Sequence, residues 1–437
     1  MAGECLAQIA DITMGQSPSG DVVSEDPTGL PLLNGPTEFG PHHPVPVQFT
    51  TDTRKQASPG DILFCVRGST TGRMNWADQE YAIGRGVAAI RHKNIPELQP
   101  LLRAVIEFEL PSLLAQATGS TFPNVSLAQL AAIPFPDLPQ SQQLAIANIF
   151  GSLDDKIEAN RRMNETLEAM AQAIFKSWFV DFDPVRAKAE GRDPGLPKDI
   201  ADLFPDRFQD SELGEIPKGW EIGVLDQLVD VMLGGDWGSD KRDAERSEAA
   251  LCIRGTDIPN LQIGGTGKMP IRYLKPSSLA KRQINDGDLV VEISGGSPTQ
   301  STGRPVLISH ELLDRLQLPL VCSNFCRFLK LKSSTASKFV YLWLRSLYDS
   351  DDLLQFENGT TGIKNLAFTL FSGAFKLCIP PASVLGAFDQ LASPLFKQQQ
   401  ASAAESDTLA NLRDALLPKL MSGAIKISSI SRLPVGR

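Results

Sequence analysis

The sequence lacks the features of membrane-bound, secreted or zinc-binding proteins. No apolar run approaches the roughly 18 residues that a transmembrane helix needs. The N-terminal stretch MAGECLAQIADITMG has no basic segment followed by an apolar core, so it is not a secretory signal. The six cysteines form no CxxC pair and have no matching histidine cluster, which argues against zinc. Scattered reduced thiols are typical of the cytoplasm, where we expect this protein to reside.

Catalytic motifs are also missing. The chain has no DPPY or NPPY motif of adenine methyltransferases, and no GxGxxG that opens a helix after a strand. The glycine-rich turn Gly264–Lys268 has the wrong spacing for a nucleotide-binding P-loop, and no Ser or Thr follows its lysine. Asp181 and Asp183 could mimic a metal site, but a linker turn with Phe182 packed inward is the simpler interpretation. We therefore expect a protein without catalytic residues, bound metal or a cofactor of its own.

Positive charge is scarce. The chain carries 42 basic and 51 acidic side chains, a net charge of −9. The excess of acid is greatest in residues 137–215, which hold sixteen acidic and nine basic side chains. Nucleic-acid binding depends on neutralising phosphates, so this chain alone should bind DNA weakly. If DNA is the ligand, a partner must supply positive charge.

The stretch from Pro139 to Trp178 has the pattern of a coiled coil. Apolar or amide residues recur at alternating steps of four and three, which is the seam of a heptad repeat. Forty helical residues would span about 60 Å, too long for an ordinary core helix. An amphipathic helix lying on its own domain is the alternative. The seam is Ile146, Phe150, Leu153, Ile157, Asn160, Asn164, Leu167, Ala171, Ile174 and Trp178, with the two asparagines as candidates for setting register.

Internal repetition decides between these alternatives. Gly60-Asp-Ile-Leu is echoed by Gly287-Asp-Leu-Val, and each motif opens an expected strand that runs into a polar glycine-rich loop. An offset of 242 residues aligns the long helix with a second helix, from about Pro394 to Leu420. Its seam is more polar and includes Gln399, Ser402, Ser406 and Arg413. The apolar residues expected to pair with the first helix are Leu395, Leu409, Leu416 and Leu420.

The repeat predicts an α+β protein with two mixed, strand-rich domains. Each domain is followed by a long helix, and we expect the helices to pair as an antiparallel coiled coil with pseudo-two-fold symmetry. The predicted divisions are a first domain at 1–136, a helix at 137–180, a linker at 181–215, a second domain at 216–380, a helix at 381–426 and a tail at 427–437.

A ligand with an approximate dyad and a long axis is duplex DNA. The repeated loops carry arginines, which bond guanine edges or phosphates, and hydroxyl and amide side chains that suit the same contacts. The alternative is that such loops are merely solvated turns. The candidate DNA-binding residues are Arg67, Ser69, Thr70, Arg73, Thr121, Asn124, Thr299, Gln300, Arg304, Thr361, Lys364 and Asn365.

The chain resembles the specificity subunits of Type I restriction–modification systems over nearly its whole length. The motifs that carry the resemblance are SWFVDFDPVRAKAEG at Ser177–Gly191, the Ile-Pro-x-Pro and helix entry at 133–150, and LLPKLMSGAI at Leu416–Ile425. The resemblance implies a non-catalytic subunit whose two target recognition domains each recognise half of a split DNA sequence.

It also implies partners. Two modification subunits, which methylate adenine with S-adenosylmethionine, would dock on the helices, and restriction subunits would add ATP-driven translocation and cleavage. The helices would set the gap between the half-sites. Two other functions stay open: a coiled-coil scaffold that joins proteins without DNA, and a DNA enzyme with duplicated recognition domains.

Overall fold

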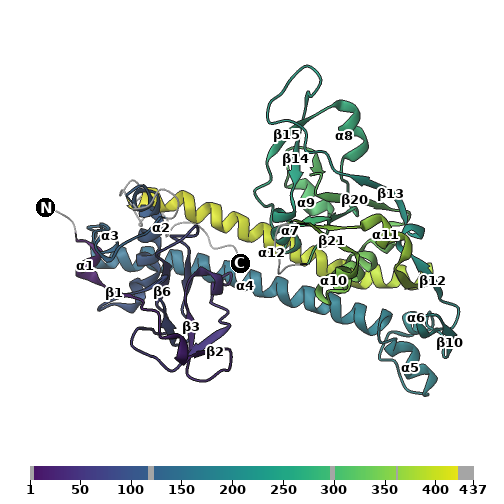
Figure 1. The fold of residues 1–437 in the computed structure, drawn as a ribbon, viewed down its shortest axis with the longest axis horizontal. Helices are drawn as coiled ribbons and strands as arrows, with labels where there is room; N and C mark the ends of the chain where they lie inside the picture. The colour runs from purple at the N-terminus through teal and green to yellow at the C-terminus, as the bar shows by residue number, and fades with distance from the viewer. Residues whose placement is uncertain (1–3, 117–122, 296–300, 361–362, 422–437) are drawn as a thin grey trace. The chain divides into compact units, whose positions relative to one another are not determined.

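The computed structural model describes residues 4–116, 123–295, 301–360 and 363–421. The chain divides into two compact units. Unit 1 comprises residues 1–158 and 408–437, and unit 2 comprises residues 159–407. Each unit is a strand-rich globule packed on its own portions of two long helices, α4 (Gln140–Phe179) and α12 (Ala382–Met421), as Figure 1 shows.

Unit 1 is built on two sheets. The first is an antiparallel sheet in the order β1-β9-β6-β7, and the second has the order β2-β4-β3-β8-β5 with β3 and β8 parallel. The strands are β1 (Ala10–Met14), β2 (Val23–Ser24), β3 (Leu30–Leu33), β4 (Gln48–Thr50), β5 (Gln56–Ala57), β6 (Ile62–Cys65), β7 (Met74–Trp76), β8 (Tyr81–Ile83) and β9 (Val87–His92). The α-helices are α1 (Leu6–Ile9), α2 (Gln99–Ala115) and α3 (Leu127–Ala131). The short 3-10 helices, labelled η, are η1 (Gly20–Val22), η2 (Pro36–Glu38) and η3 (Pro96–Leu98).

The core of unit 1 lies between the first sheet, α2 and the long helices. Every residue of β6 is buried because this central strand has a strand on each side and packing on both faces. Phe64 and Val105 share one apolar cluster with Phe150 of α4 and Leu420 of α12. The globule therefore rests on the helices through a continuous apolar core.

Unit 2 repeats this plan with additions. Its first sheet is antiparallel in the order β13-β20-β16-β18, and a second has the order β15-β14-β19 with β14 and β19 parallel. The strands are β10 (Phe208–Ser211), β11 (Gly214–Pro217), β12 (Glu221–Val224), β13 (Val229–Gly234), β14 (Glu248–Ile253), β15 (Ile271–Leu274), β16 (Leu289–Glu292), β17 (Ser294–Gly295), β18 (Pro305–Leu307), β19 (Leu320–Cys322), β20 (Cys326–Leu331), β21 (Glu357–Thr360), β22 (Ile363–Leu366) and β23 (Lys376–Ile379). The helices are α5 (Asp183–Ala189), α6 (Lys198–Ala201), η4 (Leu225–Gln227), η5 (Gly255–Asp257), α7 (Ile258–Gln262), α8 (Pro276–Arg282), α9 (His310–Asp314), η6 (Ser334–Ala336), α10 (Ser337–Asp349), η7 (Asp352–Phe356) and α11 (Phe368–Ala374).

The internal repeat seen in the sequence is present in the strand pairing. The central strands β6 and β16 are entered by equivalent turns, in which Gly60 (φ 87°) and Gly287 (φ 80°) adopt the left-handed conformation that favours glycine. In each turn an aspartate accepts a backbone N–H bond: Asp61 from Ser58 at 2.8 Å, and Asp288 from Asn285 at 2.7 Å. The two sheets thus share strand order, direction and entry turn.

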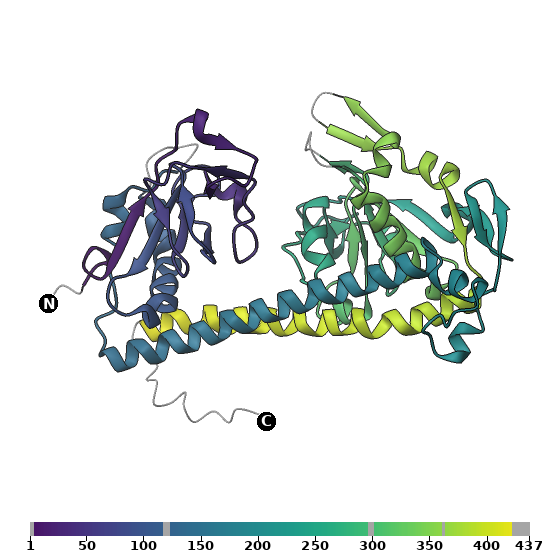
Figure 2. The ribbon, with the colours of Figure 1, turned by 90° about the horizontal axis from the view of Figure 1, so that it is seen from below.

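The long helices run antiparallel in each unit (Figure 2). In unit 2, Asn160 of α4 faces Ser402 of α12, while Trp178 lies 5.9 Å from Phe388 between ring centroids. Residue numbers along α12 therefore decrease in the direction in which those along α4 increase, so the two helices are antiparallel. In unit 1, Asp154 and Arg413 form a 3.0 Å ion pair. The fold class predicted from the sequence is confirmed in its mixed strand-rich globules and its closely packed helices.

Each seam position of α4 is buried or half-buried. Ile146, Phe150, Asn160, Asn164, Leu167, Ala171 and Trp178 are buried, and Leu153, Ile157 and Ile174 are half-buried. On α12, Leu420 is buried and Leu395, Leu409 and Leu416 are half-buried. The polar seam residues Gln399 and Ser402 are buried as well.

The two seam asparagines differ in their contacts. The amide of Asn160 donates to the Ser402 carbonyl at 3.2 Å and to Glu405 at 2.8 Å, both on α12. The amide of Asn164 donates instead to the Ile263 carbonyl at 3.1 Å, just beyond α7 of the globule. Asn160 therefore has the contacts of a register-setting residue, whereas Asn164 ties the globule of unit 2 to α4.

Two segments differ from their sequence interpretation. The second helix begins at Ala382, next to the predicted division at 381 but twelve residues before Pro394, where its seam was expected to begin. Pro394 lies exposed inside α12. Proline marks a helix start only when no packing favours continuation, and here the buried Val384 and Phe388 anchor the preceding turns. The segment interpreted as a linker, 181–215, holds α5, α6 and β10 and begins β11. Its Phe182, Val185 and Phe204 are buried.

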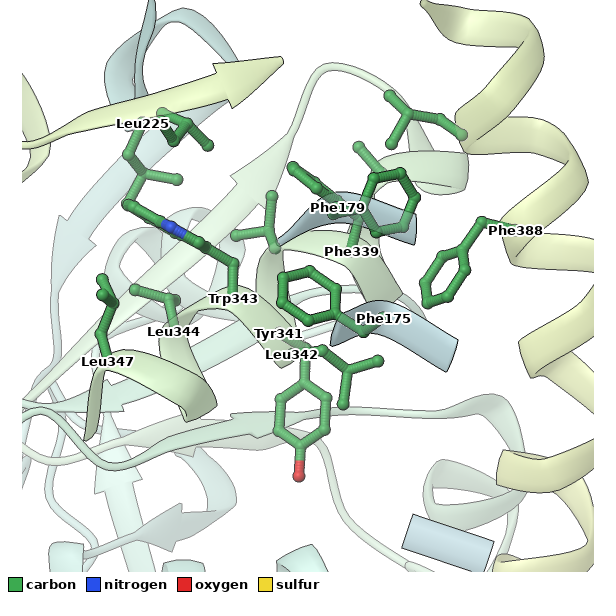
Figure 3. Close-up of a cluster of buried hydrophobic side chains, with 14 of the residues drawn as sticks. Phe175, Phe179, Leu225, Phe339, Tyr341, Leu342, Trp343, Leu344, Leu347 and Phe388 are labelled. Atoms are coloured by element: carbon green, nitrogen blue, oxygen red, sulfur yellow. The ribbon is translucent and has the colours of Figure 1, made fainter. Parts of the chain in front are cut away.

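The core of unit 2 is aromatic (Figure 3). Phe175 and Phe179 of α4 point toward Phe339 of α10 and Phe388 of α12, with Phe179 4.9 Å from both of the latter rings. The segment after α4 closes the same cluster, since Trp178 contacts Phe204 at 5.0 Å in an edge-to-face pair. This packing orders the segment that composition alone marks as a linker.

Candidate nucleic-acid interface

The two predicted loops of unit 1 meet at the end of β6. Arg67 pairs with Asn124 in an isolated antiparallel bridge, and the Val125 N–H bonds the Val66 carbonyl at 2.9 Å. The loop after β6 and the loop that ends at Asn124 are distant in sequence but adjacent in space. Arg67 follows the buried strand β6 and therefore lies at this edge of the sheet.

Unit 2 brings the equivalent loops together in the same way. Ser294 pairs with Asn365 and Gly295 with Lys364, while the Leu366 N–H bonds the Ile293 carbonyl at 2.8 Å. The β21–β22 hairpin lies at the side of this globule opposite the helix pair (Figure 2). In each unit the fold thus brings described residues of both predicted loops to one edge of the sheet.

The candidate residues differ in exposure. Arg67, Ser69, Thr70, Arg73 and Asn365 are exposed. Asn124, Arg304 and Lys364 are half-buried, and Thr121, Thr299, Gln300 and Thr361 lie outside the described residues.

Only some of the cationic candidates have free hydrogen-bonding groups. Arg73 donates to the backbone carbonyls of Phe39 at 2.6 Å and Gly40 at 3.2 Å, so its guanidinium fixes the preceding loop. Arg304 donates to the Tyr348 hydroxyl at 2.7 Å and lies over that ring, 5.2 Å from its centroid. The guanidinium of Arg67, by contrast, has no hydrogen bond or ion pair with any described residue.

Lys364 belongs to a small polar network on the hairpin. Its ammonium lies 3.3 Å from the carboxylate of Glu357, which also accepts from the Thr302 N–H at 2.6 Å and the Thr302 hydroxyl at 2.8 Å. Glu357 thus joins the hairpin to the loop before β18. A lysine held this way keeps donors for a phosphate, but part of its charge is already compensated.

A third loop shares this edge in both units, and it was not singled out from the sequence. In unit 1 the turn Gly84–Gly86 precedes β9, which lies beside β6; Gly86 accepts from the Val66 N–H at 2.9 Å. Its Arg85 is exposed, with Nε 3.1 Å from the Ser17 hydroxyl. In unit 2 the turn 323–325 precedes β20 and takes the same place, with Phe325 accepting from Ile293 at 2.8 Å.

A fourth segment completes the edge and explains two glycines. Gly15 follows β1 and Gly235 follows β13, and each N–H bonds the first residue of the neighbouring strand, Val87 or Cys326. A Cβ at Gly15 would lie 2.1 Å from the Gly84 carbonyl oxygen, and one at Gly235 2.1 Å from that of Ser323. Only glycine permits this close approach. The segments place Ser17 and Trp237 at the edge.

Buried acids lie behind the edge of unit 2. Burial raises the pKa of Glu292, the last residue of β16, and nearby Arg304 offsets part of the increase. Burial also raises the pKa of Asp288 at the other end of β16 to about 6. In both residues burial disfavours the charged carboxylate.

The described part of the chain holds no group of three or more His, Cys, Asp or Glu side chains that could bind a metal ion. Nor does any helix among the described residues have the length and apolar character to cross a membrane. The candidate interface consists of polar and cationic side chains at an equivalent sheet edge in each unit.

Residues 5–169 match the family model of the Type I restriction modification DNA specificity domain. The specificity subunit of the Type I restriction enzyme HindI of Haemophilus influenzae is 26% identical over 431 residues, covering 85% of this chain and 88% of that protein. The chain is similar to the specificity subunits of Type I restriction–modification systems. Because the match to the Haemophilus protein covers 85% of this chain, the similarity extends well beyond residues 5–169.

Two further comparisons agree. The MjaIX specificity subunit of Methanocaldococcus jannaschii is 25% identical over 322 residues, covering 71% of this chain and 65% of that protein. The crystal structure of a Type I S subunit from M. genitalium superposes with a TM-score of 0.53 at 15% identity and covers 95% of both chains. This structural likeness confirms the fold of globules and long helices.

Proposed function

We propose that this chain is the DNA-recognition subunit of a Type I restriction–modification complex. Each unit recognises one half of a split target through the edge at which its four loops meet. The observation that carries the proposal is the equivalence of these edges: the orders β1-β9-β6-β7 and β13-β20-β16-β18 place loops of matching origin side by side. Two similar but not identical recognition surfaces suit a bipartite site.

The helices have two roles in this proposal. They set the gap between the half-sites, and their outer surfaces dock two modification subunits. Both helices carry exposed apolar side chains that face no described core, including Met163 and Met170 on α4 and Leu391 and Leu412 on α12. Exposed apolar residues on a helix pair are suited to packing against further helices.

The chain itself contributes recognition, not catalysis. Methyl transfer to adenine, with S-adenosylmethionine, belongs to the modification subunits, and ATP-driven translocation and cleavage belong to restriction subunits. We place the assembled complex in the cytoplasm, where it would meet DNA. The scarcity of positive charge fits this division, because modification subunits that close around the duplex can neutralise most of the phosphates.

Methylome sequencing tests the proposal. The host genome is sequenced for modified adenine with and without the gene for this chain. We expect one split motif, with a fixed gap between its halves, to be methylated only when the gene is present. A protein scaffold that does not bind DNA would leave every methylated motif in place.

A binding experiment tests the charge argument separately. The affinity for duplex DNA that contains the split motif is measured for the chain alone and with its modification subunits, over a range of salt concentrations. We expect weak binding alone, and tight binding with a steeper salt dependence in the complex. Tight, sequence-specific binding by the chain alone would contradict the division of charge.

A further inference from the structure

The side chain of Phe325 is largely exposed on unit 2. Phe325 is 59% exposed and Phe108 is 38% exposed, whereas the other phenylalanines that the structure describes are buried or half-buried. Phe325 ends the turn between β19 and β20, directly before the buried Cys326. An isolated exposed apolar residue is common, but this one lies at an edge where the neighbouring loops are polar.

The backbone of this turn is fixed on several sides. The Ser323 N–H bonds the Ile253 carbonyl at 2.9 Å, and the Cys326 N–H closes the turn on the Ser323 carbonyl at 2.9 Å. The Phe325 carbonyl accepts from Ile293, the residue before Ser294. A large apolar side chain is therefore held without backbone freedom beside the loop that follows β16.

Neighbouring side chains of the turn are already engaged. The side-chain oxygen of Asn324 accepts from the backbone N–H of Trp237 at 2.8 Å, which holds this amide against the segment after β13. One face of Trp237 is covered by the Arg272 guanidinium, 4.2 Å from the ring centroid. Phe325, 59% exposed, is more accessible to a ligand than Trp237, which is 36% exposed.

The equivalent turn of unit 1 has a different chemistry. There the exposed residue is Arg85, followed by Gly86, where a Cβ would lie 2.3 Å from the Asn34 carbonyl oxygen. An arginine suits a guanine edge, whereas a phenyl ring suits the methyl group of thymine in the major groove. Two domains that recognise different half-sites should differ at the residues that specify the base.

We propose that Phe325 is a specificity-determining residue that contacts the 5-methyl group of one thymine in the half-site recognised by unit 2. This inference rests on the proposed function and deepens it, since it assigns an A·T pair to this position. The contact is apolar and removes the ring and the methyl group from water together. Asn324 and Trp237 hold the turn in place and make no such contact.

The test pairs a protein change with a DNA change, in the complex of the full chain with its modification subunits. After the split target is known, each thymine in both half-sites is replaced in turn by deoxyuridine, which removes only the methyl group. Binding is measured for the wild type and for Phe325→Ala. Losing a buried methyl contact corresponds to about fourfold weaker binding.

We expect one thymine, in one half-site, whose replacement weakens wild-type binding about fourfold and leaves Phe325→Ala binding unchanged. Leu213→Ala, at an apolar residue 50% exposed in the turn between β10 and β11, is the matched control and should keep the wild-type response. Phe325→Ala should keep the wild-type melting temperature, since the ring packs on little.

Three results would overturn the proposal: half-sites without a thymine, no thymine whose methyl group affects binding, or a methyl effect that persists in Phe325→Ala. A complex with no sequence preference would be a different result, because it would remove the proposed function itself. The wild-type measurement on target and scrambled DNA therefore separates failure of this contact from failure of the whole assignment.

Discussion

Two arginines that look alike in the sequence have different expected roles. Arg67 is exposed and has no polar partner among the described residues, whereas Arg73 donates to the backbone of residues 36–40. We expect Arg67→Ala to weaken DNA binding by the complex about tenfold, the cost of losing one good cationic contact, without a change in melting temperature. Binding is measured on target DNA, and melting is followed by circular dichroism.

Arg73→Ala is the matched variant for that prediction. Losing its bonds to carbonyl groups should lower the free energy of unfolding by about 1 to 2 kcal/mol. Its effect on DNA binding should be indirect and smaller than that of Arg67→Ala. If Arg73→Ala weakened DNA binding strongly with no loss of stability, the interpretation that its guanidinium stabilises the fold would be wrong.

Asp288 should make stability depend on pH. Its side chain is 4% exposed, and burial raises its pKa from 3.8 in an unfolded chain to about 6. The folded state therefore favours the protonated acid, so its contribution to stability is lost as pH rises from about 4 to about 6. Asp288→Asn should remove this dependence and raise the free energy of unfolding at pH 7 by about 2 kcal/mol.

Urea unfolding of the wild type and Asp288→Asn at pH 4, 5, 6 and 7 measures this effect. The equivalent Asp61 of unit 1 provides the contrast, because it forms an ion pair with Arg91. Asp61→Asn should therefore destabilise the protein at pH 7. Identical pH profiles for the wild type and Asp288→Asn would contradict the burial argument.

The elements that could be predicted were those with strong local periodicity. The seam of α4 follows from a heptad pattern, and β6 and β16 follow from a glycine-aspartate turn before an apolar run. The seam of α12 could not be followed before Pro394, a residue that ordinarily signals a helix boundary and that tertiary packing overrides here, although the predicted division placed the helix at 381–426. The ordered segment after α4 was missed because its apolar residues, such as Phe204, are sparse and contact a distant core.

The part of the site that could be predicted also has local signals. The loops after β6 and β16 carry glycine and arginine signals that a sequence displays directly. Arg85 and Phe325 were missed because they reach the edge only through nonlocal pairing, in which β9 and β20 insert beside β6 and β16. The two turns also share no residue type, so the internal repeat does not reveal them.

Helix α10 of unit 2 carries an arginine that forms ion pairs with an acid of its own helix and with one of α4. In unit 2, Arg345 lies 2.9 Å from Asp349 and 3.6 Å from Glu168 of α4. Burial raises the pKa of Glu168, and Arg345 offsets part of this. We expect Arg345→Met to lower the free energy of unfolding by about 3 kcal/mol at pH 8, because it leaves a largely buried carboxylate unpaired.

Adding Glu168→Gln to Arg345→Met should recover much of that loss, since the amide carries no charge. The sign of the pH effect follows from the raised pKa of Glu168: the deficit of Arg345→Met should shrink as pH falls toward 5 and the acid is protonated. Urea unfolding at pH 5 and pH 8 of both single variants and the double variant measures this. Simple additivity of the two substitutions would show that the pair is not coupled.

At the scale of the whole molecule, the two units share a plan but not a surface. Both have the central antiparallel sheet and a parallel pair beside it, β3 with β8 and β14 with β19. The edge of unit 1 presents Arg67 and Arg85, whereas that of unit 2 presents Lys364 and Phe325. A duplicated scaffold with diverged loops is what recognition of two different half-sites requires.

The length of the helices should set the gap between the half-sites. One heptad is inserted beside Asn160 in α4 and another beside Ser402 in α12, where the two residues are joined by a 3.2 Å hydrogen bond. Seven residues add about 10 Å of helix and keep the seam on the same face. At about 3.4 Å per base pair, we expect a gap roughly three base pairs longer with unchanged half-sites, measured by methylome sequencing.

A heptad in only one helix should abolish methylation, because it shifts the register of the pair. Methylation of the original motif by the double insertion would show that the helices do not set the gap.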